Sequence, residues 1–155
     1  MGRPMWMLTL AALVALVAVS GALAQQMKTE EAIDARQKLM KEQGAAMKSI
    51  QDKLKASDTN IAAEAQKLVE TSKRIPALFP EGSLDPSTSR AKPEIWQKPS
   101  EFEGNARSLN QKATALEASA KSGADVQALA AAATNIGRTT CGACHDAFRG
   151  PEIKK

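Results

Sequence analysis

Two cysteines and a histidine stand together in the pentapeptide Cys141-Gly142-Ala143-Cys144-His145, and the chain contains no other cysteine or histidine. A CxxCH segment is the attachment site of a c-type haem, in which the thiols bond the porphyrin and the imidazole binds the iron. On a helix these three side chains would share one face, because they stand at positions i, i+3 and i+4. The motif therefore predicts one covalently bound haem c, attached through Cys141 and Cys144, with His145 as the proximal ligand.

Other uses of these residues fit the sequence less well. A structural zinc site takes four ligands, usually cysteine or histidine, and the chain has only three such residues. A thioredoxin-like CxxC needs an α/β context, and no strand pattern is present. A purely structural role for two thiols would leave the coincidence of three rare residues unexplained. The sequence also lacks a glycine-rich phosphate loop, a Ser/His/Asp set and a second histidine, so we do not expect an enzyme.

Residues 1–24 have the features of a cleaved signal peptide. Arg3 provides the positive charge, an apolar run covers 5–19, and small residues at 22–24 form the cleavage site. The run is shorter than a comfortable membrane span. We therefore expect a periplasmic protein whose mature domain, 25–155, does not span a membrane. Export agrees with the motif, because c-type haem is attached outside the cytoplasm. Without Arg3, basic residues exceed acidic ones by only three, which argues against nucleic-acid binding.

The elements that must position the motif are helices. Alanine, lysine, glutamate, glutamine and leucine are abundant, and all favour helix. Apolar residues recur every three or four positions in four stretches, for which Thr29, Ser100 and Asp125 are expected caps. The predicted helices cover residues 29–54, 59–75, 100–121 and 125–149. This pattern predicts an all-α, antiparallel up-down-up-down four-helix bundle, an architecture that also hosts haem proteins.

One connection, residues 76–92, is much longer than the others and rich in proline. We call it the strap. Long connections in compact domains often have a function, but a crossover without chemistry is the simpler interpretation. Leu78 and Phe79 should pin the strap to the bundle, and a single helical turn over 93–97 should bury Trp96.

A second protein ligand to the iron would have to come from a methionine upstream of the motif. The expected mature chain contains Met27, Met40 and Met47, and we expect Met27 to lie in a frayed start. In an up-down bundle the end of the last helix faces the start of the first, so Met40 is the better candidate. Spacing alone fits a core-filling role for Met40 equally well, and both interpretations stay open.

Polar side chains interrupt the apolar face of the first helix at Arg36 and Gln43. A polar residue in such a place needs a partner, and a haem propionate would be one for Arg36. Several further residues could contact the haem or a partner but fit a surface or sealing role equally well. Arg138 and Arg149 could pair with a propionate, Phe148 could pack on the porphyrin edge, and lysines 38 and 41 could attract an acidic redox partner.

Four segments give the chain a family resemblance over residues 27–150. They read RQKLMK at 36–41, PALFP at 76–80, KPEIW at 92–96 and CGACHDAFR at 141–149. The sequence resembles class II cytochromes c, the family of cytochrome c′ and its low-spin relatives of the cytochrome c-556 type. The resemblance implies a four-helix bundle with a covalent haem, and its KLMK segment implies Met40 as the sixth ligand. Pro99 departs from the continuous third helix of such relatives.

Ligation by His145 and Met40 would leave no open position on the iron, which favours electron transfer over ligand binding. We therefore expect a one-electron carrier that serves periplasmic redox partner proteins as a monomer or homodimer. The alternative is a five-coordinate protein of the cytochrome c′ kind that binds or buffers NO or CO, with Met40 merely crowding the iron.

Overall fold

A computed structural model describes residues 28–153, in which all regular elements are helical apart from one isolated bridge between Ala91 and Arg149. The predicted signal peptide lies outside the described residues. Within 28–153 no helix is both long enough and apolar enough to cross a membrane. The elements are α1 (Thr29–Lys55), α2 (Ala62–Arg74), the 3-10 turn η1 (Pro76–Leu78), α3 (Glu94–Gln97), α4 (Pro99–Lys121), α5 (Val126–Ile136), the π-helical segment η2 (Gly137–Gly142) and α6 (Ala143–Phe148).

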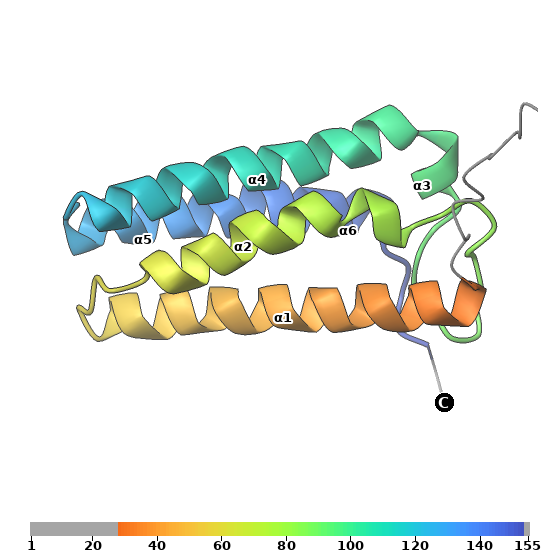
Figure 1. The fold of residues 1–155 in the computed structure, drawn as a ribbon, viewed down its shortest axis with the longest axis horizontal. Helices are drawn as coiled ribbons and strands as arrows, with labels where there is room; N and C mark the ends of the chain where they lie inside the picture. The colour runs from red at the N-terminus through yellow and green to blue at the C-terminus, as the bar shows by residue number, and fades with distance from the viewer. Residues whose placement is uncertain (1–27, 154–155) are drawn as a thin grey trace, which may run out of the picture.

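The long helices form an antiparallel four-helix bundle, as predicted, with α5, η2 and α6 together making the fourth member (Figure 1). Short turns join α1 to α2 and α4 to α5 at one end of the bundle. The strap, α3 and the end of α6 gather at the other end, beside the start of α1 (Figure 1). The last helix therefore ends where the first begins, which is the arrangement needed to bring Met40 near the motif.

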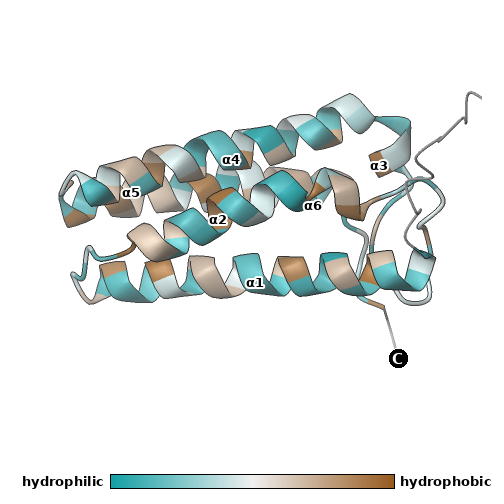
Figure 2. Ribbon diagram, in the orientation of Figure 1, coloured by the Kyte–Doolittle hydropathy of each residue, from teal (hydrophilic) through white to brown (hydrophobic). Residues whose placement is uncertain are grey.

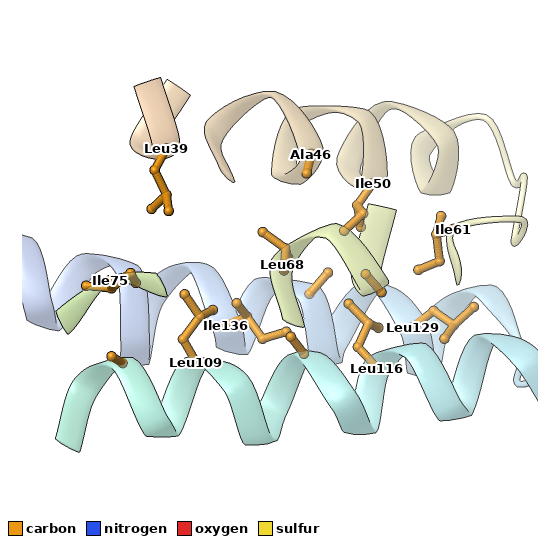
Figure 3. Packing of buried hydrophobic residues seen from close by; sticks show 14 of the residues in the cluster. Leu39, Ala46, Ile50, Ile61, Leu68, Ile75, Leu109, Leu116, Leu129 and Ile136 are labelled. Atoms are coloured by element: carbon orange, nitrogen blue, oxygen red, sulfur yellow. The ribbon is translucent and has the colours of Figure 1, made fainter. Parts of the chain in front are cut away.

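The core is built from one apolar stripe on each helix. Hydrophobic and hydrophilic residues alternate along the helices in Figure 2, and the apolar side chains point into the bundle in Figure 3. The largest hydrophobic side chains that are fully buried come from all four members: Leu39, Ile50, Ile61, Leu68, Leu116, Leu129 and Ile136. The residues that the spacing places on the inner face of the second predicted helix are all buried: Ile61, Ala65, Leu68, Ser72 and Ile75. On the third, Phe102, Ala106, Leu109, Ala113 and Leu116 are buried and Ala120 is half-buried.

Two of the three predicted caps differ in the structure. Thr29 is the first residue of α1 and not its cap, and the backbone nitrogen of Lys28 donates to Glu31 Oε2 at 3.3 Å. Helix α4 begins at Pro99, one residue before the expected cap Ser100, because a first-turn proline needs no backbone donor. Asp125 caps α5 as predicted, and its Oδ1 accepts from two backbone nitrogens at 2.9 Å each.

The second helix is shorter than the predicted 59–75. Helix α2 starts at Ala62 because Ser57 adopts a left-handed conformation (φ 60°) and the Asp58 side chain accepts from the backbone nitrogen of Asn60. These local bonds extend the turn between α1 and α2 by three residues. At its other end, α2 stops at Arg74, and Pro76 opens η1.

The predicted fourth helix is not one continuous α-helix. Ile136 and Thr140 are buried, so a regular helix would next turn residue 143 inward. Ala143 is exposed, however, whereas Cys144 is half-buried and Phe148 is buried. The wider π turn of η2 therefore shifts the inward face by about one residue, as π-bulges at functional sites commonly do. This shift turns the motif toward the interior while α5 keeps its own buried stripe.

The strap is tied to the bundle at both of its ends. Trp96 is only half-buried, and Ile95 fills the interior position expected for it. The Trp96 indole instead donates to the carbonyl oxygens of Phe79 and Pro80, both at 3.0 Å.

The end of the strap also pairs with the chain that follows the motif. The backbone nitrogen of Lys92 donates to Phe148 O at 3.0 Å, and that of Gly150 donates to Arg90 O at 2.7 Å. These bonds hold the chain on the far side of the motif, so the motif is restrained by α5 before it and by the strap after it.

Candidate functional site

A cavity of about 620 Å³ lies beside the CxxCH motif. All six residues proposed for the haem from the sequence line it: Arg36, Met40, Cys141, Cys144, His145 and Phe148. Helix α1 supplies the first two of these, and η2 and α6 supply the rest. The fold thus brings together side chains from the first and last members of the bundle.

The cavity exists because α1 is held apart from η2 and α6. Helix α1 packs on α2 and α5, whereas η2 and α6 pack on α4, and α6 also packs on α3. Between α1 and the motif, side chains from α4 close the space, among them Phe102 and Leu109. The walls are mainly apolar, and the volume falls within the range of about 300–1,000 Å³ typical of ligand pockets.

Both motif cysteines are free, half-buried thiols. Burial raises the pKa of Cys141, although a hydrogen bond with Thr140 partly opposes the change. Burial, reinforced by the neighbouring Cys141, raises the pKa of Cys144 to about 11. Both side chains are therefore neutral thiols at physiological pH.

The His145 imidazole is uncharged at neutral pH. Burial lowers its pKa, and the positive charges of Arg149 and Arg90 lower it further, while Asp146 acts in the opposite direction. A histidine must be deprotonated to bind a metal, so this environment favours ligation. The strap residue Arg90 lines the cavity as well, and no local pattern in the sequence pointed to it.

The two methionines of α1 line the cavity at different heights. A Cβ atom on Gly137 would lie 3.7 Å from Met47 Cε, so Met47 sits beside the start of η2. Helix α1 runs opposite to η2 and α6, so a step back along α1 corresponds to a step of similar length forward along η2 and α6. Seven residues back from Met47 is Met40, and seven residues forward from Gly137 is Cys144. Met40 thus comes level with the Cys144–His145 end of the motif.

Arg36 is a buried cation that no carboxylate neutralises among residues 28–153. It is 3% exposed, and its guanidinium donates to Ser83 Oγ at 2.9 Å, Ser83 O at 2.8 Å and Ser89 Oγ at 2.7 Å. Its central carbon lies 4.8 Å from the centre of the Phe79 ring. Burial lowers the pKa of this group, but a guanidinium keeps its charge at physiological pH. An anionic group in the cavity would complement it.

The remaining candidates divide between cavity and surface. Phe148 is buried and makes an edge-to-face contact with Phe102 at 5.4 Å between ring centres, so it both lines the cavity and closes the bundle end. Arg149 and Lys41 also line the cavity, whereas Arg138 and Lys38 are exposed and do not.

These residues fit a covalently attached haem. Two thiols, a neutral imidazole, a thioether and an uncompensated guanidinium face one mainly apolar cavity, which suits a porphyrin that carries an iron and two carboxylates. The zinc alternative gains no support, since in the part of the chain that the structure describes no three His, Cys, Asp or Glu side chains gather as metal ligands would.

Comparisons with known proteins agree with this site. The family model described as Cytochrome C' matches residues 31–149. A cytochrome c′ of Rhodopseudomonas palustris is 33% identical over 125 residues, which cover 77% of this chain and 82% of that protein. The crystal structure of cytochrome c′ from Thermochromatium tepidum is similar with a TM-score of 0.73 at 27% identity, over 81% of this chain and 99% of that one. The structure of a ferrous cytochrome c′ variant from Alcaligenes xylosoxidans with bound NO is similar with a TM-score of 0.71 at 27% identity, over 81% of this chain and 98% of that one.

Proposed function

The chain belongs to the cytochrome c′ family, and we propose that it carries single electrons on one haem c held between His145 and Met40. Members of this family bind a covalent c-type haem, and Cys141 and Cys144 are the thiols that would attach it here. The observation that supports Met40 most directly is the register of α1, in which Met47 lies beside Gly137 and Met40 therefore comes level with the motif.

Each residue has a distinct task in this proposal. When bound, the haem iron supplies the Fe(III)/Fe(II) couple. The neutral His145 imidazole offers a nitrogen lone pair, and the strap bonds at Phe148 O and Gly150 N restrain the backbone that follows it. The Met40 thioether is uncharged and soft, so it favours the ferrous state and raises the reduction potential. With both positions taken, water and other small molecules are kept from the iron.

The Arg36 guanidinium would hold a propionate. Its three hydrogen bonds leave it fixed against the strap without neutralising its charge. A carboxylate beside it would remove the cost of a buried unpaired cation. Arg36 is fixed by Ser83 and Ser89, so the strap would contribute indirectly to the position of the haem.

The finer assignment, to the low-spin branch of the c-556 type, is part of the same proposal. It is supported by the resemblance of the segment 36–41, in which methionine stands at position 40. We also propose that the protein is exported to the periplasm, exchanges electrons with redox partner proteins there, and is not an enzyme.

A second candidate function is the binding of NO or CO by a five-coordinate iron. It is favoured by the similarity to the cytochrome c′ of Alcaligenes xylosoxidans, whose structure holds NO. In this case Met40 would lie beside the iron without bonding it, and the same cavity would admit a diatomic molecule.

Absorption spectra of the oxidised and reduced mature protein test the two candidates. We expect a low-spin ferric spectrum with the weak far-red charge-transfer band of a methionine–iron bond, and little reaction of the reduced protein with CO. Met40→Ala should convert it to a high-spin protein that binds CO readily. Met47→Ala is the matched control, because Met47 lines the same cavity, and it should leave the spectrum unchanged. A high-spin spectrum of the unaltered protein would favour gas binding.

A further inference from the structure

One half-buried glutamine, Gln43, lines the mainly apolar cavity within a helical turn of Met40. Gln43 belongs to α1, is half-buried, and lines the cavity together with Met40 and Met47. Other α1 residues of the lining, such as Gln37 and Gln51, are exposed. Positions i and i+3 of a helix share a face, so Gln43 and Met40 look toward the same side of the cavity. The proposed electron carrier has no use for this amide.

The amide of Gln43 is held in a single orientation by Thr71 of α2. The Thr71 hydroxyl donates its proton to Lys67 O at 2.7 Å, so its oxygen accepts from Gln43 Nε2 at 3.1 Å. A reversed amide would bring the Gln43 carbonyl against an oxygen that has no further proton to offer. Thr71 is 1% exposed, which fixes this contact in the core.

The contact with Thr71 uses only one of the two Nε2 protons of Gln43. Among residues 28–153 the Gln43 side chain makes no other hydrogen bond. One N–H therefore remains available to a molecule in the cavity. Because Thr71 already restricts the Gln43 side chain, a ligand that accepts from this N–H would cost the side chain little further conformational entropy.

We propose that, wherever Met40 does not occupy the iron, Gln43 donates a hydrogen bond to small molecules that bind the iron on the Met40 side. The cavity would then favour ligands that accept hydrogen bonds strongly, such as fluoride on ferric iron, over a weak acceptor such as CO on ferrous iron. Thr71 is a positioning residue in this arrangement, because it acts only through Gln43. The inference rests on the proposed function in one respect, which is that a haem occupies this cavity with His145 on its other side.

Ligand titrations of the haem protein followed by absorption test the proposal. Met40→Ala opens the iron on the Met40 side, and Gln43→Leu is then introduced into the Met40→Ala protein. Fluoride affinity of the ferric protein should fall about tenfold or more with the loss of one hydrogen bond to a charged acceptor, while CO affinity of the ferrous protein should stay within about twofold. Thr71→Val, which keeps the amide but releases it, should give an intermediate loss for fluoride.

Gln66→Leu serves as the control, since Gln66 is an exposed glutamine of α2 that bonds Glu70 outside the cavity; it should change neither affinity. Unchanged fluoride binding in Gln43→Leu would overturn the proposal, and so would equal losses for fluoride and CO, which would mean that Gln43 only shapes the cavity. If Gln43→Leu does not yield a folded haem protein, Thr71→Val decides. The spectrum of the unaltered protein tests the bond between Met40 and the iron separately. If that spectrum is high-spin, the Gln43→Leu and Thr71→Val substitutions are made without Met40→Ala, and the same fluoride and CO titrations are compared.

Discussion

Arg36 shows how a single side chain links the strap to the cavity. Its guanidinium is buried, lies over the Phe79 ring, and donates to three oxygens of Ser83 and Ser89. None of these oxygens carries a charge, so the residue organises the strap while its charge remains available to an anion. The presence of Arg36 on the apolar face of α1 is thus explained by its contacts with residues some fifty positions away in the sequence.

Replacing Arg36 by leucine should lower the free energy of unfolding of the haem protein by about 2–3 kcal/mol, because buried serine oxygens lose their charged donor. Arg36→Lys should recover only part of this loss, since lysine lacks the planar fork that reaches both serines. Urea unfolding followed by circular dichroism measures both values. Arg107→Leu removes an exposed pair with Glu103 and should change stability by less than about 0.5 kcal/mol. An equally stable Arg36→Leu protein would show that these contacts contribute little.

Among the helices, buried faces were easier to predict from the sequence than helix ends. The faces of α2 and α4 follow from local periodicity, and the ends of α1 and α4 were predicted to within one residue. The late start of α2 depends on the left-handed Ser57, a conformation that no sequence signal demanded. The π turn of η2 depends on how the motif must face α1, which is a tertiary requirement. Ser100 satisfied a sequence pattern for a cap, but Pro99 begins the helix instead.

A pair of substitutions tests these helix starts. Asp125→Ala should destabilise the protein by about 1 kcal/mol, because two backbone donors of α5 lose their acceptor. Ser100→Ala should change stability by only a few tenths of a kcal/mol, because Ser100 lies inside α4 and caps nothing. Thermal unfolding of both variants under the same conditions provides the comparison. Equal losses would mean that Ser100 caps α4 after all.

The contact between α1 and α2 should depend on pH. Lys53 Nζ lies 2.6 Å from Glu64 Oε1. This bond holds the pKa of Glu64 below its ordinary value of 4.5 against the opposing effect of burial, and bonds from the Glu64 backbone and Ser49 add to it. A carboxyl with a lowered pKa stabilises the folded state above its ordinary pKa, and the contribution is lost as the pH falls through the lowered value. Lys53→Met should therefore lower stability at pH 7 by up to about 1 kcal/mol. In acid this difference should fall to what the bond from Lys53 Nζ to Asn60 O contributes.

Urea unfolding at several pH values measures this difference. Lys67→Met is the matched control, because Lys67 and Glu70 form a more exposed pair at 3.8 Å on the same helix. It should have little effect at any pH. A Lys53→Met difference that persists unchanged in acid would show that Lys53 acts through packing and not through Glu64.

For the molecule as a whole, the cavity sets the main demand on stability. Without the haem, about 620 Å³ of mainly apolar space would be open to water, and apolar surface left in water does not contribute to folding. The net stability of a typical domain is only about 5–15 kcal/mol. The bundle therefore needs the haem as part of its core, and the chain without it should collapse or admit water.

Removal of the covalent attachment tests this dependence. A Cys141→Ser, Cys144→Ser protein purified without haem should keep much of its far-ultraviolet helical signal but lose near-ultraviolet signal and cooperative unfolding. Added haem should restore cooperativity in part, because His145 and Met40 remain. A haem-free protein that unfolds in one sharp transition would contradict the argument.

The residues of the candidate site were predictable to the extent that their types are rare. Cysteine and histidine occur only in the motif, and few methionines remain for the opposite side. Arg90 and the Thr71 contact were not predictable, because an arginine in a strap and a threonine on a helix are common and gain meaning only from their neighbours. The cavity itself required the packing of several helices and the strap, which no local pattern encodes.

Met40 and His145 lie about a hundred residues apart in the sequence yet line one cavity. Under the proposed ligation, the iron is a cross-link that closes most of the domain into a single loop, and such closures restrict the unfolded chain. Since a thioether holds ferrous iron better than ferric, each arriving electron would tighten this link. The free energy of unfolding would then depend on the oxidation state of the iron. Amide hydrogen exchange in the core should be slower in the reduced protein than in the oxidised one.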